Sequence, residues 1–119
     1  MTDILKITRG DVYYACLDPV MGSETGKTRP VLVIQNDIGN LHSPTIIVAV
    51  ITDYSAKKAS YPICVPIKKE HGLKKDSIVN LAQIRTLDKQ RLIKPKIATL
   101  PDRVMIQVDK ALKHSLSLA

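Results

Sequence analysis

The sequence predicts a mainly β fold that ends in one α-helix. Short segments of strand-forming residues, separated by turn residues, recur between positions 11 and 99. After Pro101 the apolar residues recur with the period of a helix. The chain has 119 residues, 45% of them hydrophobic, so it is long enough to bury a core, and we expect a single domain over residues 1–119. It lacks Trp and Phe, so that core must be built from aliphatic side chains.

The first expected strand runs from Asp11 to Leu17 and ends at a turn that begins with Asp18. Strand alternation places Tyr13 and Tyr14 on opposite faces, so one of these rings enters the core. The following residues up to position 28 are rich in Gly, Ser, Thr and Lys, which is typical of a mobile loop.

Two β-branched runs form the expected central hairpin. Arg29–Gln35 and Thr45–Ile51 show little alternation, as expected for strands covered on both faces in a small barrel or sheet stack, and residues 37–44 are predicted to form the turn between them. An antiparallel register in which paired residue numbers sum to 81 places Arg29 opposite Thr52. Opposed side chains have Cβ atoms about 4.5 to 5.5 Å apart, so a guanidinium and a hydroxyl could hold one phosphate at this end of the hairpin.

Three further strands follow this hairpin. Ser60–Ile67 is expected at an edge of the sheet, because Pro62 and Pro66 cannot donate hydrogen bonds to a neighbouring strand. Asp76–Ile84 and Leu92–Thr99 complete the set.

Two helical segments are predicted in the last third of the chain. Asp88 is a candidate cap for one helical turn that continues to Arg91. Pro101 and Asp102 suit the start of a longer helix, because proline fits the first turn and a carboxylate suits the positive end of the helix. One stripe of this helix is apolar and contains Val104, Met105, Val108, Ala111, Leu112 and Leu116.

Charge and cysteine content narrow the functional classes. Eighteen Lys and Arg against eleven Asp and Glu give a net charge of +7, which indicates an anionic partner such as nucleic acid. The lysine pairs in loop-like stretches, Lys74-Lys75 among them, are expected to be solvated. Cys16 and Cys64 lack the spacing of a zinc site, so we expect two buried free thiols and no metal. No apolar run approaches the roughly 20 residues of a membrane span and no signal-peptide pattern is present, so a cytoplasmic protein without membrane contact is expected.

Several motifs, in order and at similar spacing from about Ile7 to the C-terminal helix, carry a family resemblance. They are Arg9-Gly10-Asp11-Val12-Tyr13, Asp18-Pro19, Gly22-Ser23-Glu24, the run from Arg29 to Asp37, Ser43-Pro44-Thr45, Val48 to Thr52 and Gln83-Ile84-Arg85-Thr86. Together they resemble the MazF/PemK family of toxin endoribonucleases. The resemblance implies a compact SH3-like β-barrel of the PemK/CcdB type, a homodimer, and sequence-dependent cleavage of single-stranded RNA without a metal or other cofactor. It also implies neutralisation by a cognate antitoxin.

The resemblance also implies site residues. Arg29 and Thr52 fall on the catalytic positions of the family. Glu24, Asn36 and Gln83 match positions associated with RNA binding, and Ser23 and Lys27 of the loop are added as candidate substrate-binding residues. Ala82 departs from the family, where an acidic residue is expected, and Tyr14 stands where Phe is common; both departures bear on substrate preference and dimer detail.

The chemistry of these residues agrees with RNA cleavage. RNA carries its own nucleophile, the ribose 2′-hydroxyl, so the enzyme must orient it and stabilise charge on the phosphate. The guanidinium fork of Arg29 suits phosphate oxygens, and Thr52 can add a hydrogen bond; the general base is not assigned.

Two other functions share parts of this pattern. A topoisomerase poison of the CcdB type shares the fold, but those toxins resemble one another in a tryptophan-containing tail, whereas this chain has no Trp and ends in Ser115-Leu116-Ser117-Leu118-Ala119. A non-catalytic RNA-binding barrel is indicated by the charge alone.

Overall fold

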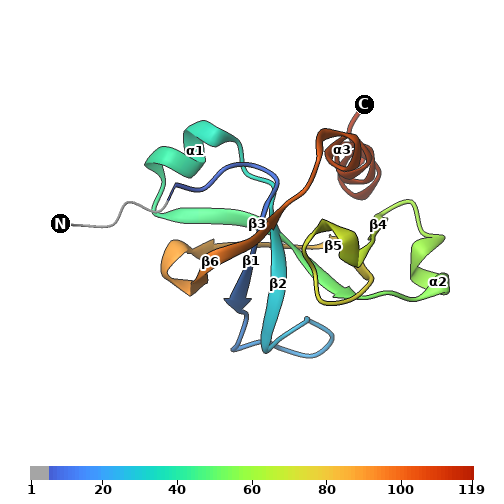
Figure 1. The fold of residues 1–119 in the computed structure, drawn as a ribbon, viewed down its shortest axis with the longest axis horizontal. Coiled ribbons are helices and arrows are strands. Elements are labelled where there is room, and N and C mark those ends of the chain that lie inside the picture. Colours follow the sequence, from blue (N-terminus) through green and yellow to red (C-terminus); the bar gives the residue numbers. More distant parts are fainter. Residues whose placement is uncertain (1–5) are drawn as a thin grey trace.

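The computed structural model describes residues 6–119 as a twisted antiparallel sheet with one long helix against it (Figure 1). The sheet has six strands in the order β4-β5-β3-β2-β1-β6. The strands are β1 (Asp11–Cys16), β2 (Thr28–Val33), β3 (Thr45–Asp53), β4 (Cys64–Ile67), β5 (Ser77–Asp88) and β6 (Leu92–Thr99). The helical elements are α1 (Asp37–His42), α2 (Ala56–Ala59), η1 (Lys69–His71), η2 (Lys89–Arg91) and α3 (Asp102–Leu116).

The predicted mainly β fold with a C-terminal helix is confirmed. The hydrogen-bonded order leaves β4 and β6 as edges, so within residues 6–119 the sheet is barrel-like in its twist but not closed. Edge strand β4 contains Pro66, as predicted, because an edge position tolerates a residue without an amide donor. The predicted strand from Ser60 is shorter in the structure, since residues 60–63 form the turn that follows α2.

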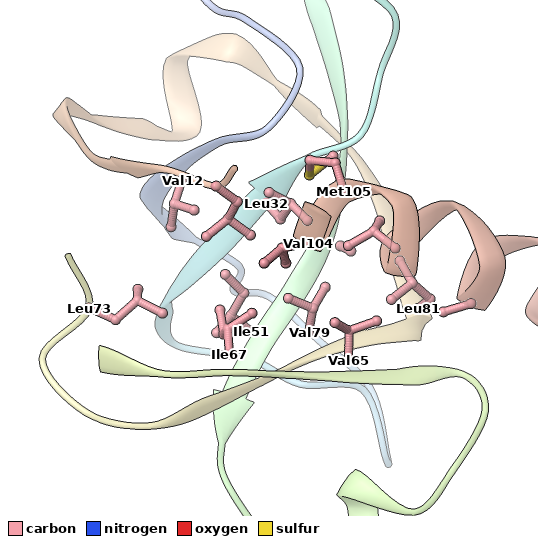
Figure 2. Close-up of a cluster of buried hydrophobic side chains, with 14 residues drawn as sticks. Val12, Leu32, Ile51, Val65, Ile67, Leu73, Val79, Leu81, Val104 and Met105 are labelled. Atoms are coloured by element: carbon pink, nitrogen blue, oxygen red, sulfur yellow. The ribbon is translucent and has the colours of Figure 1, made fainter. Parts of the chain in front are cut away.

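The central strands are covered on both faces, as their β-branched runs predict. Leu32 and Ile51 belong to a core cluster completed by the buried face of α3, where Val104 and Met105 meet them (Figure 2). Val31 and Val50 belong to a second cluster on the opposite face, which also takes up the ring of Tyr13. Alternate residues of β2 and β3 therefore enter different clusters, and water is excluded from both faces of these central strands where the clusters cover them.

The segment between β2 and β3 differs from the prediction. Residues 37–44 were expected to form a turn, but Asp37–His42 form the helix α1. The helix begins there because the Asn36 side chain accepts a hydrogen bond from the backbone N–H of Gly39 at 2.8 Å. The Asn40 side chain, which is buried, donates to the Gln35 carbonyl and fixes the helix against the strand end.

Other local expectations have mixed outcomes. Asp88 caps η2, as predicted, and its carboxylate accepts a hydrogen bond from the backbone N–H of Gln90 at 2.8 Å.

Both cysteines are free thiols, but only Cys64 is buried. The expectation of a buried Cys16 is wrong, because this residue ends β1 and its side chain is exposed at the sheet end. No helix in residues 6–119 has the length and apolar character needed to span a membrane.

Candidate active site

The pairing of β2 with β3 brings the two predicted catalytic residues to the same end of the sheet. Val31 lies opposite Val50 and Val33 opposite Val48, which confirms the predicted register. Continuing this register toward the start of β2 places Arg29 opposite Thr52. Residues two apart on a strand share a face, so alternation places the Arg29 side chain on the face of Val31 and the Thr52 side chain on the face of Val50.

Arg29 and Thr52 line one cavity of about 260 Å³. By strand alternation, its lining combines residues from both faces of the sheet. The remaining lining residues are Tyr14, Thr28, Pro30, Ile51, Asp53, Leu73, Lys74, Lys75 and Ser77.

The Thr52 hydroxyl is the unusual polar group of this cavity. Its oxygen is buried and has no hydrogen-bond partner within residues 6–119. A buried hydroxyl without a partner costs roughly 1 to 3 kcal/mol, so most such groups in folded proteins are satisfied. The Thr52 hydroxyl is therefore a donor and acceptor without a partner in the described residues, on a residue that lines the same cavity as Arg29.

Arg29 is half-buried and held by the loop that precedes β2. Its Nε donates to the carbonyl of Gly26 at 3.4 Å. The loop is in turn closed by the Asp18 carboxylate, which accepts a hydrogen bond from the backbone N–H of Lys27 at 2.9 Å. A Cβ on Gly26 would lie 2.5 Å from that same Asp18 carboxylate oxygen, so this close approach requires glycine.

The cavity is predominantly cationic. Lys75 Nζ lies 2.9 Å from the Asp53 carboxylate, and the Lys74 ammonium lies 5.8 Å from the centre of the Tyr14 ring. The hydrogen bond and charge of Lys75, with a smaller contribution from Arg29, lower the pKa of Asp53. Three cations thus share the cavity with one carboxylate, an arrangement suited to an anion such as a phosphate.

The candidate RNA-binding residues of the loop lie beside this cavity and do not line it. Ser23 and Glu24 are exposed, and the Glu24 carboxylate accepts a hydrogen bond from the Met21 backbone N–H at 2.6 Å. Lys27 is exposed with a positive φ of 64°. The Gln83 amide oxygen accepts a long hydrogen bond, 3.5 Å, from the backbone N–H of Thr25, which ties β5 to the loop.

Asn36 lies away from the cavity. It follows β2 at the end opposite Arg29, seven residues along the chain, and it is not among the residues that line the cavity. Its side chain caps α1, a role for which asparagine is well suited. The three histidines are also dispersed, since they lie in α1, η1 and α3.

The sequence reasoning missed part of the cavity. Lys74 and Lys75 were expected to be solvated loop lysines, and both are exposed, but they also line the cavity that contains Arg29. The two lysines reach the cavity because they directly precede β5, whose Ser77 pairs with Asp53 next to Thr52. Their position in the sequence before a predicted strand was visible, but the pairing of that strand with β3 could not be predicted from the charge of a lysine pair.

Comparisons with known proteins agree with this fold. Residues 8–116 match the family model described as the PemK-like, MazF-like toxin of type II toxin-antitoxin system. The endoribonuclease MazF of Staphylococcus epidermidis is 58% identical over 113 residues, which cover 94% of this chain and 92% of that protein. The endoribonuclease EndoA of Bacillus subtilis (strain 168) is 57% identical over 113 residues, 94% of this chain and 96% of that protein.

Solved structures show the same fold at lower identity. A mycobacterial endoribonuclease in complex with its cognate antitoxin superimposes with a TM-score of 0.78 at 23% identity, over 95% of this chain and 97% of that chain. MazF from Deinococcus radiodurans superimposes with a TM-score of 0.78 at 23% identity, over 96% of this chain and 99% of that chain.

Proposed function

The chain belongs to the PemK-like, MazF-like toxin family of type II toxin-antitoxin systems and is an endoribonuclease, and we propose that it cleaves single-stranded RNA at the cavity of Arg29 and Thr52. The observation that carries the assignment of the site is the unpartnered Thr52 hydroxyl opposite a half-buried arginine. A scissile phosphate at this position would receive hydrogen bonds from both groups.

The proposed reaction uses the nucleophile that RNA itself provides. The ribose 2′-hydroxyl releases its proton to solvent as its oxygen forms a bond to the adjacent phosphorus, the bond from phosphorus to the 5′-oxygen breaks, and the 5′-oxygen takes up a proton from solvent. The products are a 2′,3′-cyclic phosphate and a 5′-hydroxyl end. Each reacting atom belongs to the substrate, so the protein contributes position and charge stabilisation.

Arg29 is assigned to charge stabilisation in this scheme. Its guanidinium can donate two hydrogen bonds to phosphate oxygens, and arginine stays protonated in proteins. A unit charge at about 4 Å and an effective dielectric near 20 contributes on the order of 4 kcal/mol before desolvation is subtracted. Thr52 donates a hydrogen bond to another phosphate oxygen and gains the partner it lacks in the free protein.

The RNA strand is proposed to extend from the cavity along the loop before β2. Ser23, Glu24 and Lys27 present exposed side chains there, and Gln83 reaches the loop from β5. Asn36 follows the other end of β2 and does not line the cavity, so we assign it to a more distant part of the substrate.

Partners and location follow from the family. We propose a homodimer that acts in the cytoplasm as one domain and is neutralised by a cognate antitoxin. The support is membership in a family of type II toxin-antitoxin toxins, together with the solved structure of a mycobacterial endoribonuclease in complex with its cognate antitoxin.

A cleavage assay with end mapping tests the proposed function. Purified protein is incubated with single-stranded RNA in excess chelator, and the ends of the fragments are mapped. We expect cuts at a short sequence, with 5′-hydroxyl and cyclic phosphate ends. If the RNA stays intact and a separate assay shows that the protein inhibits gyrase, the protein is a topoisomerase poison. If RNA is bound but not cut, the protein is a passive binding protein. Either result would contradict the proposal.

A further inference from the structure

A second cavity, of about 440 Å³, lies beyond Thr52 and is lined by Tyr54, Pro66, Ile67, Lys68 and Asp76. None of these residues has a role in the proposed chemistry. We propose that this cavity is a base-binding subsite, in which the Tyr54 ring stacks on a nucleobase next to the scissile phosphate. The proposal deepens the proposed function and rests on it, because it requires an RNA strand bound at Arg29 and Thr52.

The strand register places this cavity on the face of the sheet that carries the Thr52 side chain. Thr52 and Pro66 both lie opposite Ile78, so these three residues form one row across β3, β5 and β4. Directly opposed residues share a face, and Arg29 continues the row on the other side of Thr52. The row therefore leads from the catalytic pair to a wall of the second cavity.

The next row on the same face forms the rest of the cavity. Continuing the same two registers places Tyr54 opposite Asp76 and Asp76 opposite Lys68. The backbone N–H of Tyr54 donates to the Asp76 carbonyl at 3.3 Å, which shows that the pairing continues beyond β3. Two residues along a strand span about 7 Å, a length comparable with one nucleotide step of an extended RNA strand.

The side chains of the cavity match a nucleobase and its phosphate. Tyr54 is 49% exposed, so its side chain is accessible to a ligand, and Pro66 adds an apolar wall. Lys68 supplies a positive charge, which a flanking phosphate requires. The Asp76 carboxylate already accepts one hydrogen bond, from the Lys69 backbone N–H at 3.1 Å, and retains lone pairs that can accept from an amino group of a base.

RNA is a better occupant than an acidic or apolar protein segment. The cavity continues the row of the catalytic pair, where the substrate must already lie. Further positive charge adjoins it, because Lys57 and Lys58 of α2 follow Tyr54 in the chain and both are exposed. Exposed aromatic rings among lysines are the features that bind successive bases of a single strand.

Fluorescence provides a direct test, because the chain contains no Trp. Tyr54→Trp places a single indole in the cavity, and Tyr61→Trp, at a tyrosine that is 41% exposed, is the matched control. The probe is an RNA oligonucleotide with the mapped cleavage site and a 2′-deoxy sugar at the attacking nucleotide, which binds without being cut. We expect quenching of the Tyr54→Trp emission, loss of that quenching with an abasic site at one flanking position, and no such dependence for Tyr61→Trp.

Binding measurements supply a second test. Tyr54→Ala should weaken binding of the same probe about tenfold, the effect of one lost base stack, whereas Tyr54→Phe should bind like the wild type. Three outcomes would overturn the subsite. They are equal quenching of both Trp variants by RNA, quenching that no abasic position removes, and quenching by the cognate antitoxin but not by RNA. Failure of the wild type to cut RNA would contradict the proposed function instead, and the emission with intact RNA would still decide whether a base stacks at Tyr54.

Discussion

The Asp53 carboxylate and the Lys75 ammonium lie 2.9 Å apart on the wall of the cavity that contains Arg29. Both side chains are about two-thirds exposed, 67% and 68%, so the pair is screened by water and contributes little to folding. Its main consequence is electrostatic, because the carboxylate is the one negative group facing the three cations of the cavity.

Removal of that carboxylate should strengthen RNA binding. Asp53→Asn leaves the cations uncompensated, and we expect roughly two- to fivefold tighter binding of an uncleavable RNA at low salt. The gain should shrink as salt is added, because screening acts on this interaction. Fluorescence anisotropy across a salt series measures both effects, with Asp102→Asn on α3 as the control for net charge. Equal gains in the two variants would show that Asp53 has no local effect on the site.

Arg29→Ala should lower the rate of RNA cleavage about 100-fold or more, by analogy with the loss of one oxyanion donor. Arg29→Lys should recover only part of this loss, because an ammonium cannot donate two parallel hydrogen bonds to a phosphate. Single-turnover cleavage assays measure the rates, and Arg103→Ala, at an exposed position of α3, is the matched control. A folded Arg29→Ala protein with near-normal cleavage would remove Arg29 from the mechanism.

Thr52→Val should separate activity from stability. Valine retains the shape of threonine and removes a buried hydroxyl that has no partner within residues 6–119, so thermal unfolding should occur at the same or a higher temperature. Cleavage should fall roughly 10- to 100-fold, because the hydrogen bond to the phosphate is lost. Thr52→Ser should keep most of the activity. A Thr52→Val protein that is less stable and fully active would show that the hydroxyl has a structural role.

The hairpin was the part of the fold most open to sequence reasoning. Its strands are β-branched runs of similar length, and their pairing follows once the turn is placed, so the opposition of Arg29 and Thr52 could be predicted. The same reasoning could not separate a turn from a helix at residues 37–44. That outcome depends on the local Asn36 cap, which accepts from the Gly39 backbone N–H, and on the buried Asn40, whose partner is the Gln35 carbonyl just beyond the end of β2.

Contacts between distant segments were not predictable from local patterns. The pairing of β3 with β5 shifts in register between Ala49 and Val50 of β3. Residues 81–83 of β5 therefore have no opposite residue on β3. This irregularity brings Gln83 to the loop before β2 and lets Arg85 donate to the carbonyl of Leu17 at 2.6 Å. No periodicity in the sequence marks such a bulge, so its effect on the site becomes visible only in the folded sheet.

Acid should weaken the fold partly through Asp37. Its carboxylate accepts hydrogen bonds from the backbone N–H of Arg9 at 2.7 Å and from the side chain of Asn40 at 3.1 Å. The first of these is the main reason that the pKa of Asp37 lies below its ordinary value of 3.8. A carboxyl whose pKa is lower in the folded state stabilises the fold at neutral pH, and that stabilisation is lost as the pH falls through the folded pKa.

Urea unfolding between about pH 5 and pH 2 measures this loss. The wild-type midpoint should fall across that range, and the fall should be smaller in Asp37→Asn, which has no proton to take up at this site and is already less stable at pH 7. Glu70→Gln is the control. The Glu70 carboxylate is 63% exposed, and its distance of 4.0 Å to His71 Nε2 is too long for a hydrogen bond. The same acid-dependent fall in Asp37→Asn as in the wild type would assign the loss to other carboxylates, with Asp53 next in order because Lys75 also lowers its pKa.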